Sequence, residues 1–129
     1  MILTIKDETF SGEVLNELQI ELKSETVTVK EIIESRVSQE VRDYNIKSLD
    51  KFKGLIEPSN AEKQINGYKL KKGRKLDAEK QIYVALDAFS KNGFFMLIDN
   101  LQAESLNQKV KISDKTLISF VKLTPLIGG

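Results

Sequence analysis

The start of the chain alternates apolar and polar residues with the period of two that is typical of strands. An expected first strand, Met1–Lys6, has Leu3 and Ile5 on one face. A second, Leu15–Leu22, alternates in the same way after a turn at Gly12. Two amphipathic strands so close together predict an antiparallel hairpin with one face covered and the other facing solvent.

The pattern then changes to helical spacing. Thr28 followed three residues later by Glu31 is a capping box, which predicts that a helix begins there and runs over Val29–Tyr44. Its apolar stripe is expected to lie across the hairpin and consists of Val29, Ile32, Ile33, Val37, Val41 and Tyr44. Charged residues on the opposite face are expected to be solvated, namely Lys30, Glu34, Arg36 and Glu40.

Residues 45–76 have no clear period, and they include the basic run Lys69–Lys75. A basic run can contact phosphate or RNA, but Tyr68 is the one aromatic residue beside it. A solvent-exposed surface hairpin is therefore the favoured interpretation of this run.

A second helix is predicted from the N-cap Asp77 to about Lys91, with Asn92 and Gly93 as its C-terminal stop. Its expected buried stripe is Ala78, Ile82, Ala85, Leu86 and Phe89.

Three further segments follow this helix. The apolar run Phe94–Ile98 predicts a central strand that is buried on both faces, and residues 99–100 turn the chain. Leu106, Val110 and Ile112 suggest a short irregular piece or a weak edge strand. A last strand is expected over Thr116–Leu123.

The composition and charge of the chain argue against several classes of function. The length of 129 residues predicts a single domain. The net charge of only +1 argues against bulk electrostatic binding of nucleic acid. Cysteine and histidine are both absent, so there is no disulfide, thiolate nucleophile, imidazole base or ordinary zinc site. No cofactor is expected. The chain is not expected to be an enzyme, because no pair of carboxylates has a spacing that suggests catalysis. With no signal peptide and no apolar run of about 18 residues, we expect a cytoplasmic protein that does not enter a membrane.

The last residues indicate a functional tail. Pro125 lacks an amide proton, so a strand cannot continue through it, and residues 124–129 should leave the sheet as a free tail. The tail ends in Gly128 and Gly129, whose backbone is thin enough to enter a channel that side chains would block. We therefore expect the Gly129 carboxylate to be the functional group.

The order of hairpin, helix, strand, short segment, last strand and Gly-Gly tail resembles the β-grasp fold of ubiquitin and its relatives, an α+β class. The resemblance is carried by the capped helix start over 26–33, by 96–106, by 114–117 and by the ending 126–129. It covers 1–44 and 94–129. Residues 45–93, with their extra helix, are an insertion relative to ubiquitin, and no arginines precede the Gly-Gly. The chain therefore looks more like the divergent bacterial ubiquitin-like proteins, some of which act in defence against phages.

The resemblance implies that the protein is a substrate and tag, not a catalyst. A partner activating enzyme would adenylate Gly129, a conjugating enzyme would pass it to lysines of target proteins, and a JAB-type protease would release it. Thr124, Pro125, Leu126 and Ile127 would be read together with Gly128 and Gly129. A docking face beside the tail would use Met96, Ile98, Val121 and Leu123.

Two other functions remain open from the sequence. Sulfur carriers share the fold and the Gly-Gly ending but carry a thiocarboxylate there. A ubiquitin-like binding module would never have its tail activated. Self-association through the insertion is a further open possibility, and the sequence does not identify the targets.

Overall fold

The structure is a computed structural model, and it describes residues 1–47, 62–64, 67–69 and 76–122. Its two helices are α1 (Val29–Lys47) and α2 (Ala78–Ser90). The described strands are β1 (Ile2–Glu8), β2 (Val14–Glu21), β3 (Thr26–Thr28), β4 (Glu62–Gln64), β5 (Gly67–Lys69), β6 (Phe94–Ile98), β7 (Leu101–Gln102), β8 (Lys109–Lys111) and β9 (Ile118–Lys122).

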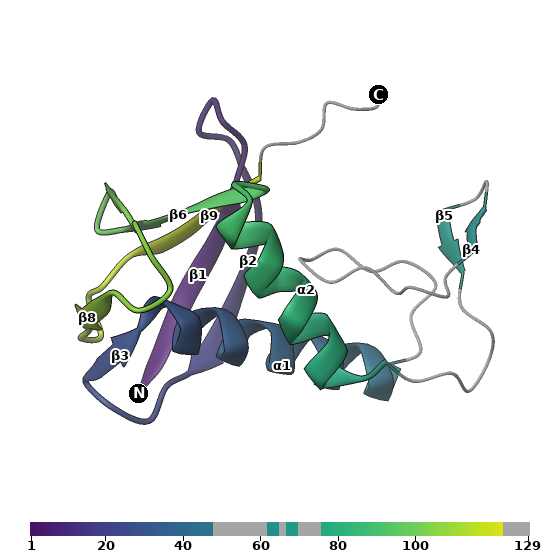
Figure 1. The fold of residues 1–129 in the computed structure, drawn as a ribbon, viewed down its shortest axis with the longest axis horizontal. Coiled ribbons are helices and arrows are strands. Elements are labelled where there is room, and N and C mark those ends of the chain that lie inside the picture. The colour runs from purple at the N-terminus through teal and green to yellow at the C-terminus, as the bar shows by residue number, and fades with distance from the viewer. Residues whose placement is uncertain (48–61, 65–66, 70–75, 123–129) are drawn as a thin grey trace.

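Five strands form one mixed sheet in the order β2-β1-β9-β6-β7. β1 and β9 run parallel, and the other neighbouring strands are antiparallel. The expected hairpin of β1 and β2 is confirmed, with a register that pairs Leu3 with Ile20 and Ile5 with Leu18. The last strand of the chain thus lies in the middle of the sheet beside the first (Figure 1).

Phe94–Ile98 forms β6, an interior strand of the sheet as predicted, but the prediction that this strand is buried on both faces is wrong. β6 lies next to the short edge strand β7, and β9 holds the central position because it pairs with both β1 and β6. The second face of β6 is only half covered, since the side chains of Phe95 and Leu97 are half-buried. An unbroken apolar run does not separate a strand covered on both faces from one covered on one face and partly on the other.

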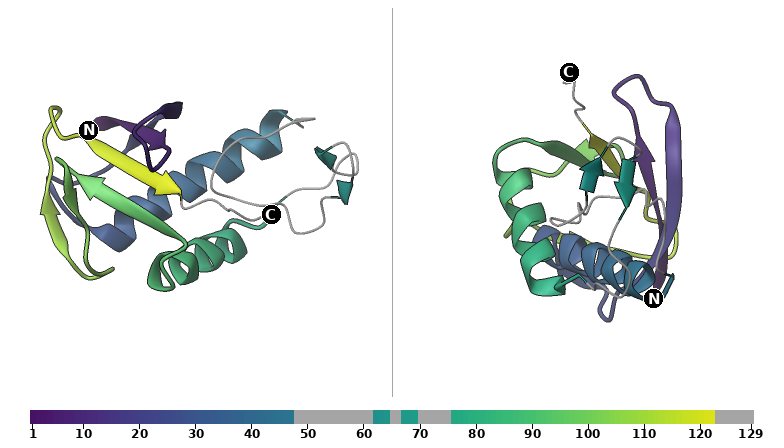
Figure 2. Two further views of the ribbon diagram at one scale, coloured as in Figure 1. Left: turned by 90° about the horizontal axis from the view of Figure 1, so that it is seen from above. Right: turned by 90° about the vertical axis from the view of Figure 1, so that its right-hand side faces the viewer.

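Both helices lie on one side of the sheet, with α1 crossing the strands and α2 packed beside it (Figure 2). The predicted stripe of α1 is buried at every position from Val29 to Tyr44. The stripe of α2 is buried at Ala85 and Phe89, while Ala78, Ile82 and Leu86 pack against the core with partial exposure. The core is therefore a layer between the helices and the inward residues of the sheet.

The predicted start of α1 is confirmed. The backbone N–H of Thr28 donates to Glu31 Oε1 at 2.8 Å, and the backbone N–H of Glu31 donates to Thr28 Oγ1 at 3.1 Å. This reciprocal pair satisfies two amide groups that the helix itself leaves without partners. Inside this cap the first residue, Val29, is fully buried.

The predicted N-cap and C-terminal stop of α2 are confirmed as well. The Asp77 carboxylate accepts the backbone N–H of Glu79 at 3.0 Å. At the other end, Asn92 adopts a positive φ of 63°, and the N–H of Gly93 donates to the carbonyl of Ala88 at 2.7 Å. That bond and the one from Asn92 to Phe89 form a Schellman motif, which returns the chain directly into β6.

Two small ladders accompany the main sheet. β8 pairs with β3, which gives the expected weak strand near Val110 a partner at the start of α1. β4 and β5 form a two-stranded hairpin that ends at Lys69. Residues 70–75 of the basic run lie outside the described residues, so the solvent-exposed hairpin expected for this run stays a prediction.

The described residues form a mixed α and β fold with a five-stranded mixed sheet and two helices, compatible with a β-grasp arrangement. In the described part of the chain, neither helix combines the length and the apolar character needed to span a membrane.

Candidate functional site at the end of the last strand

The last described residue is Lys122, at the end of β9. The predicted tail residues lie beyond it and outside the described residues: Thr124, Pro125, Leu126, Ile127, Gly128 and Gly129. Leu123, from the predicted docking face, lies outside them as well. The candidate site is therefore the part of the sheet from which this tail continues.

Both neighbours of β9 support its C-terminal end. Lys122 is opposite Phe94 in the antiparallel ladder with β6, and Val121 is opposite Glu8 in the parallel ladder with β1. Lys122 therefore lies at the end of the sheet where β6 begins and where β1 and β9 end. Any segment that follows starts from a strand paired on both sides.

The docking face expected from the sequence is wrong at two positions. Met96 has no exposed surface and Ile98 is 8% exposed, and both belong to the core beneath the helices. Val121 points to the outer face of the sheet, because its neighbour Phe120 points into the core, but it is only 6% exposed. Met96, Ile98 and Val121 thus do not form one exposed surface.

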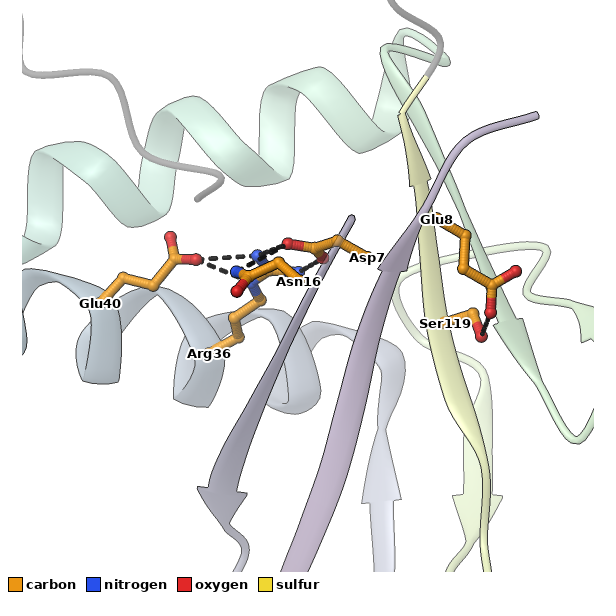
Figure 3. A network of polar contacts seen from close by, with 6 residues as sticks. All are labelled: Asp7, Glu8, Asn16, Arg36, Glu40 and Ser119. Carbon is orange, nitrogen blue, oxygen red and sulfur yellow. Dashed lines mark hydrogen bonds and ion pairs between the residues drawn. The ribbon is translucent and has the colours of Figure 1, made fainter. Parts of the chain in front are cut away.

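The outer face beside the tail is instead formed by the alternate residues of the same strands. Phe95 is paired with Val121 and Leu97 with Ser119, and all except Val121 are half-buried. The Ser119 hydroxyl donates to Glu8 Oε2 at 2.7 Å on this outer side (Figure 3). The register that places Phe95 outward was not readable from five consecutive apolar residues.

A buried ionic network lies on the opposite, inner side of β1 and β9. The guanidinium of Arg36 in α1 donates from Nη1 and Nη2 to Asp7, with 2.7 Å between Nη2 and Oδ2. Its Nε and Nη2 also donate to Glu40 Oε2 at 3.1 and 2.8 Å (Figure 3). Arg36 has no exposed surface, and Glu40 is 4% exposed.

This network corrects the expectation that the charged face of α1 is solvated. Lys30 is exposed and Glu34 is partly exposed, whereas Arg36 and Glu40 are buried against the sheet. The signal that could have revealed it is Asp7, which continues the inward series of Leu3 and Ile5. A carboxylate at that position needs a buried cation.

The charges are mutually stabilised. Burial opposes the charge of Arg36, but hydrogen bonds and the negative charges of Asp7 and Glu40 outweigh that effect, so the Arg36 pKa is raised above its ordinary value. The guanidinium also stacks over the Phe120 ring, with Cζ 4.6 Å from the ring centroid. α1 is thereby fixed to β1 and to β9 near the end that leads to the tail.

The tip of the β1–β2 hairpin projects beyond the same edge of the sheet. Two backbone hydrogen bonds stabilise its turn: the N–H of Thr9 donates to the carbonyl of Glu13, and the N–H of Gly12 donates to the carbonyl of Thr9. Gly12 has a φ of 96°, which agrees with the predicted turn at this residue. Phe10 at the tip is 78% exposed.

The described residues contain no group of three or more side chains suited to hold a metal ion. Searches against protein-family models, curated proteins and solved structures found no match to this chain.

Proposed function

We propose that this chain is a ubiquitin-like protein modifier with a β-grasp fold, whose Gly129 carboxylate is activated by a partner and joined to amines of target proteins. The observation that carries the proposal is the position of β9, central in the sheet and parallel to β1, followed within seven residues by a terminal Gly-Gly. A firmly anchored strand followed by a narrow ending suits a tail that another protein must grasp.

The chemistry proposed belongs to the tail and its partners. A Gly129 carboxylate oxygen attacks the α-phosphate of ATP, and pyrophosphate leaves. This activation is needed because a free carboxylate is a poor electrophile, whereas the adenylate carries AMP as a leaving group. The acyl group then passes to a side chain of the partner as AMP departs, and finally to a target amine. Each transfer forms one bond at the Gly129 carbonyl carbon and breaks one.

The body of the protein supplies the surface for recognition. The proposed docking face consists of the outer side of β6 and β9, where Phe95 and Leu97 are half-buried and lie next to Val121. This face is continuous with the end of β9, so a partner that binds it would be close to the tail. The partners proposed are an activating enzyme, a conjugating enzyme and a JAB-type protease, and defence against phages is the proposed context.

An exchange assay tests the proposal. The activating partner, purified from the native host by its activity on the intact chain, is expected to exchange pyrophosphate with ATP only when Gly129 ends the chain. Deleting Gly129, or adding one alanine after it, is expected to abolish the exchange. A Lys115→Ala variant, altered at an exposed lysine away from the end of β9, is the matched control and should keep it.

Other outcomes identify other functions. A mass increase that corresponds to sulfur in place of oxygen at Gly129 would favour a sulfur carrier. Full biological activity after deletion of Gly128 and Gly129 would favour a binding module whose tail is never activated. Either result would contradict the proposed conjugation.

A further inference from the structure

A hollow of about 490 Å³ lies between the end of α2, the beginning of β6 and the segment after β7. Its inner wall is apolar, with the buried side chains of Phe89, Phe94 and Ala103. Phe95 and Leu106 extend this apolar lining with half-buried side chains. The remaining lining is polar, so the hollow is an apolar cleft with a polar rim.

The hollow also borders an open edge of the sheet. β7 pairs with β6 only at Leu97 and Ile98, and one further bond joins the N–H of Ala103 to the carbonyl of Met96 at 2.8 Å. Backbone groups alternate in direction along a strand, so the N–H and C=O of Phe94 point to the same edge as those of Met96. β7 ends at Gln102, before the level of Phe94, so among the described residues no strand pairs with Phe94 on this edge.

The chain itself supplies a segment that fits. Lys122 is directly opposite Phe94 in the ladder, and seven residues follow Lys122. Four of these seven are apolar, and the pair Leu126 and Ile127 is the most apolar part. Passing from β9 around the start of β6 to its other edge takes two strand spacings, about 10 Å, which three extended residues span. The segment after Lys122 is therefore long enough for its residues 126 and 127 to reach the hollow.

We propose that the hollow binds Leu126 and Ile127 of the chain's own C-terminal segment, which holds the Gly129 carboxylate against the body of the protein. This inference rests on the proposed function in one respect: release of the segment becomes the step that makes the tail available to its activating partner. Burial of two branched aliphatic side chains among aromatic rings favours the bound state. A partner must compete with that burial.

Paramagnetic relaxation in the full chain tests this proposal. The sequence contains no cysteine, so a Gly129→Cys variant accepts one nitroxide label at a single site. The amide signals of Ala103 and Leu106, at the hollow, are expected to relax severalfold faster than in a labelled variant that also carries Leu126→Ser and Ile127→Ser. The amide of Ser38, in a separate groove between α1 and β2, is the internal control and should be unaffected.

Two results would overturn the proposal. Equal relaxation at Ala103 and Leu106 with and without the serine substitutions would show that the apolar pair does not bind there. Relaxation transferred from labelled chains to isotope-labelled chains without a nitroxide would assign the hollow to the tail of a second copy. Because the measurement needs no ATP and no partner, failure of the adenylation assay and failure of this experiment are independent.

Discussion

The carboxylate of Asp7 and the guanidinium of Arg36 form a bidentate ion pair that joins β1 to α1 across 29 positions of sequence. Both side chains are buried, and Glu40 shares the same guanidinium. Planar guanidinium and carboxylate groups fix distance and orientation together. The pair therefore sets how α1 crosses the sheet near the end of β9.

Removing the cation is expected to be costly. Arg36→Met leaves the carboxylates of Asp7 and Glu40 buried with their shared partner lost, and should lower the free energy of unfolding by about 3–5 kcal/mol. Urea denaturation measures the loss. Arg42→Met, at an exposed arginine of the same helix, is the matched control and should change stability by no more than about 0.5 kcal/mol. A similar small effect for both variants would refute the role given to the network.

The capping box at the start of α1 predicts a smaller effect. Thr28→Ala removes the hydroxyl that accepts the Glu31 N–H, and should cost about 1 kcal/mol of unfolding free energy. Ser38→Ala, in the middle of the same helix, removes a hydroxyl without removing a cap and should show no loss. Equal losses in the two variants would mean that the cap contributes nothing specific.

The positive φ of Asn92 predicts a difference between two substitutions at one position. Asn92→Ala introduces a side chain that disfavours the left-handed conformation and should cost about 1 kcal/mol, whereas Asn92→Gly should keep or increase stability. Thermal unfolding of the two variants, monitored by circular dichroism, compares them directly. The prediction is wrong if alanine is tolerated as well as glycine.

Stability should also fall at high pH because of Tyr44. Burial raises the pKa of this phenol above its ordinary value of 10.0, so the unfolded chain loses the proton at a lower pH than the folded chain does. The tyrosine makes no pH-dependent contribution below about pH 10, and the folded state loses relative stability as the pH rises above that value. Denaturant titrations from pH 8 to 11 on wild type and Tyr44→Phe should show a shallower decline in the variant.

Local signals in the sequence were sufficient for much of the fold. The cap of α1 depends on two residues three positions apart, and Asp77 acts on an amide two positions away, so both are visible without tertiary structure. The alternation of Leu3 and Ile5 likewise identified the inner face of β1. These features need only neighbouring residues.

Other features depend on contacts between distant segments. Asp7 and Arg36 meet only after α1 has crossed β1, so helical periodicity alone placed Arg36 on a solvated face. The inward direction of Met96 and Ile98 follows from the pairing of β6 with β9, since an all-apolar strand has no preferred face in its own sequence. Phe95 and Leu97 were missed for the same reason.

If this protein is a conjugated modifier, its C-terminal residues are found attached to lysines of other proteins. The last lysine or arginine of the chain is Lys122, so trypsin should leave residues 123–129 as a branch on each modified lysine. Mass spectrometry of proteins from the native host is expected to find this seven-residue branch, and to find none when Gly129 is deleted from the gene. If the branch is absent from cells that express the intact chain with its proposed partners, the account of this protein as a conjugated modifier is contradicted.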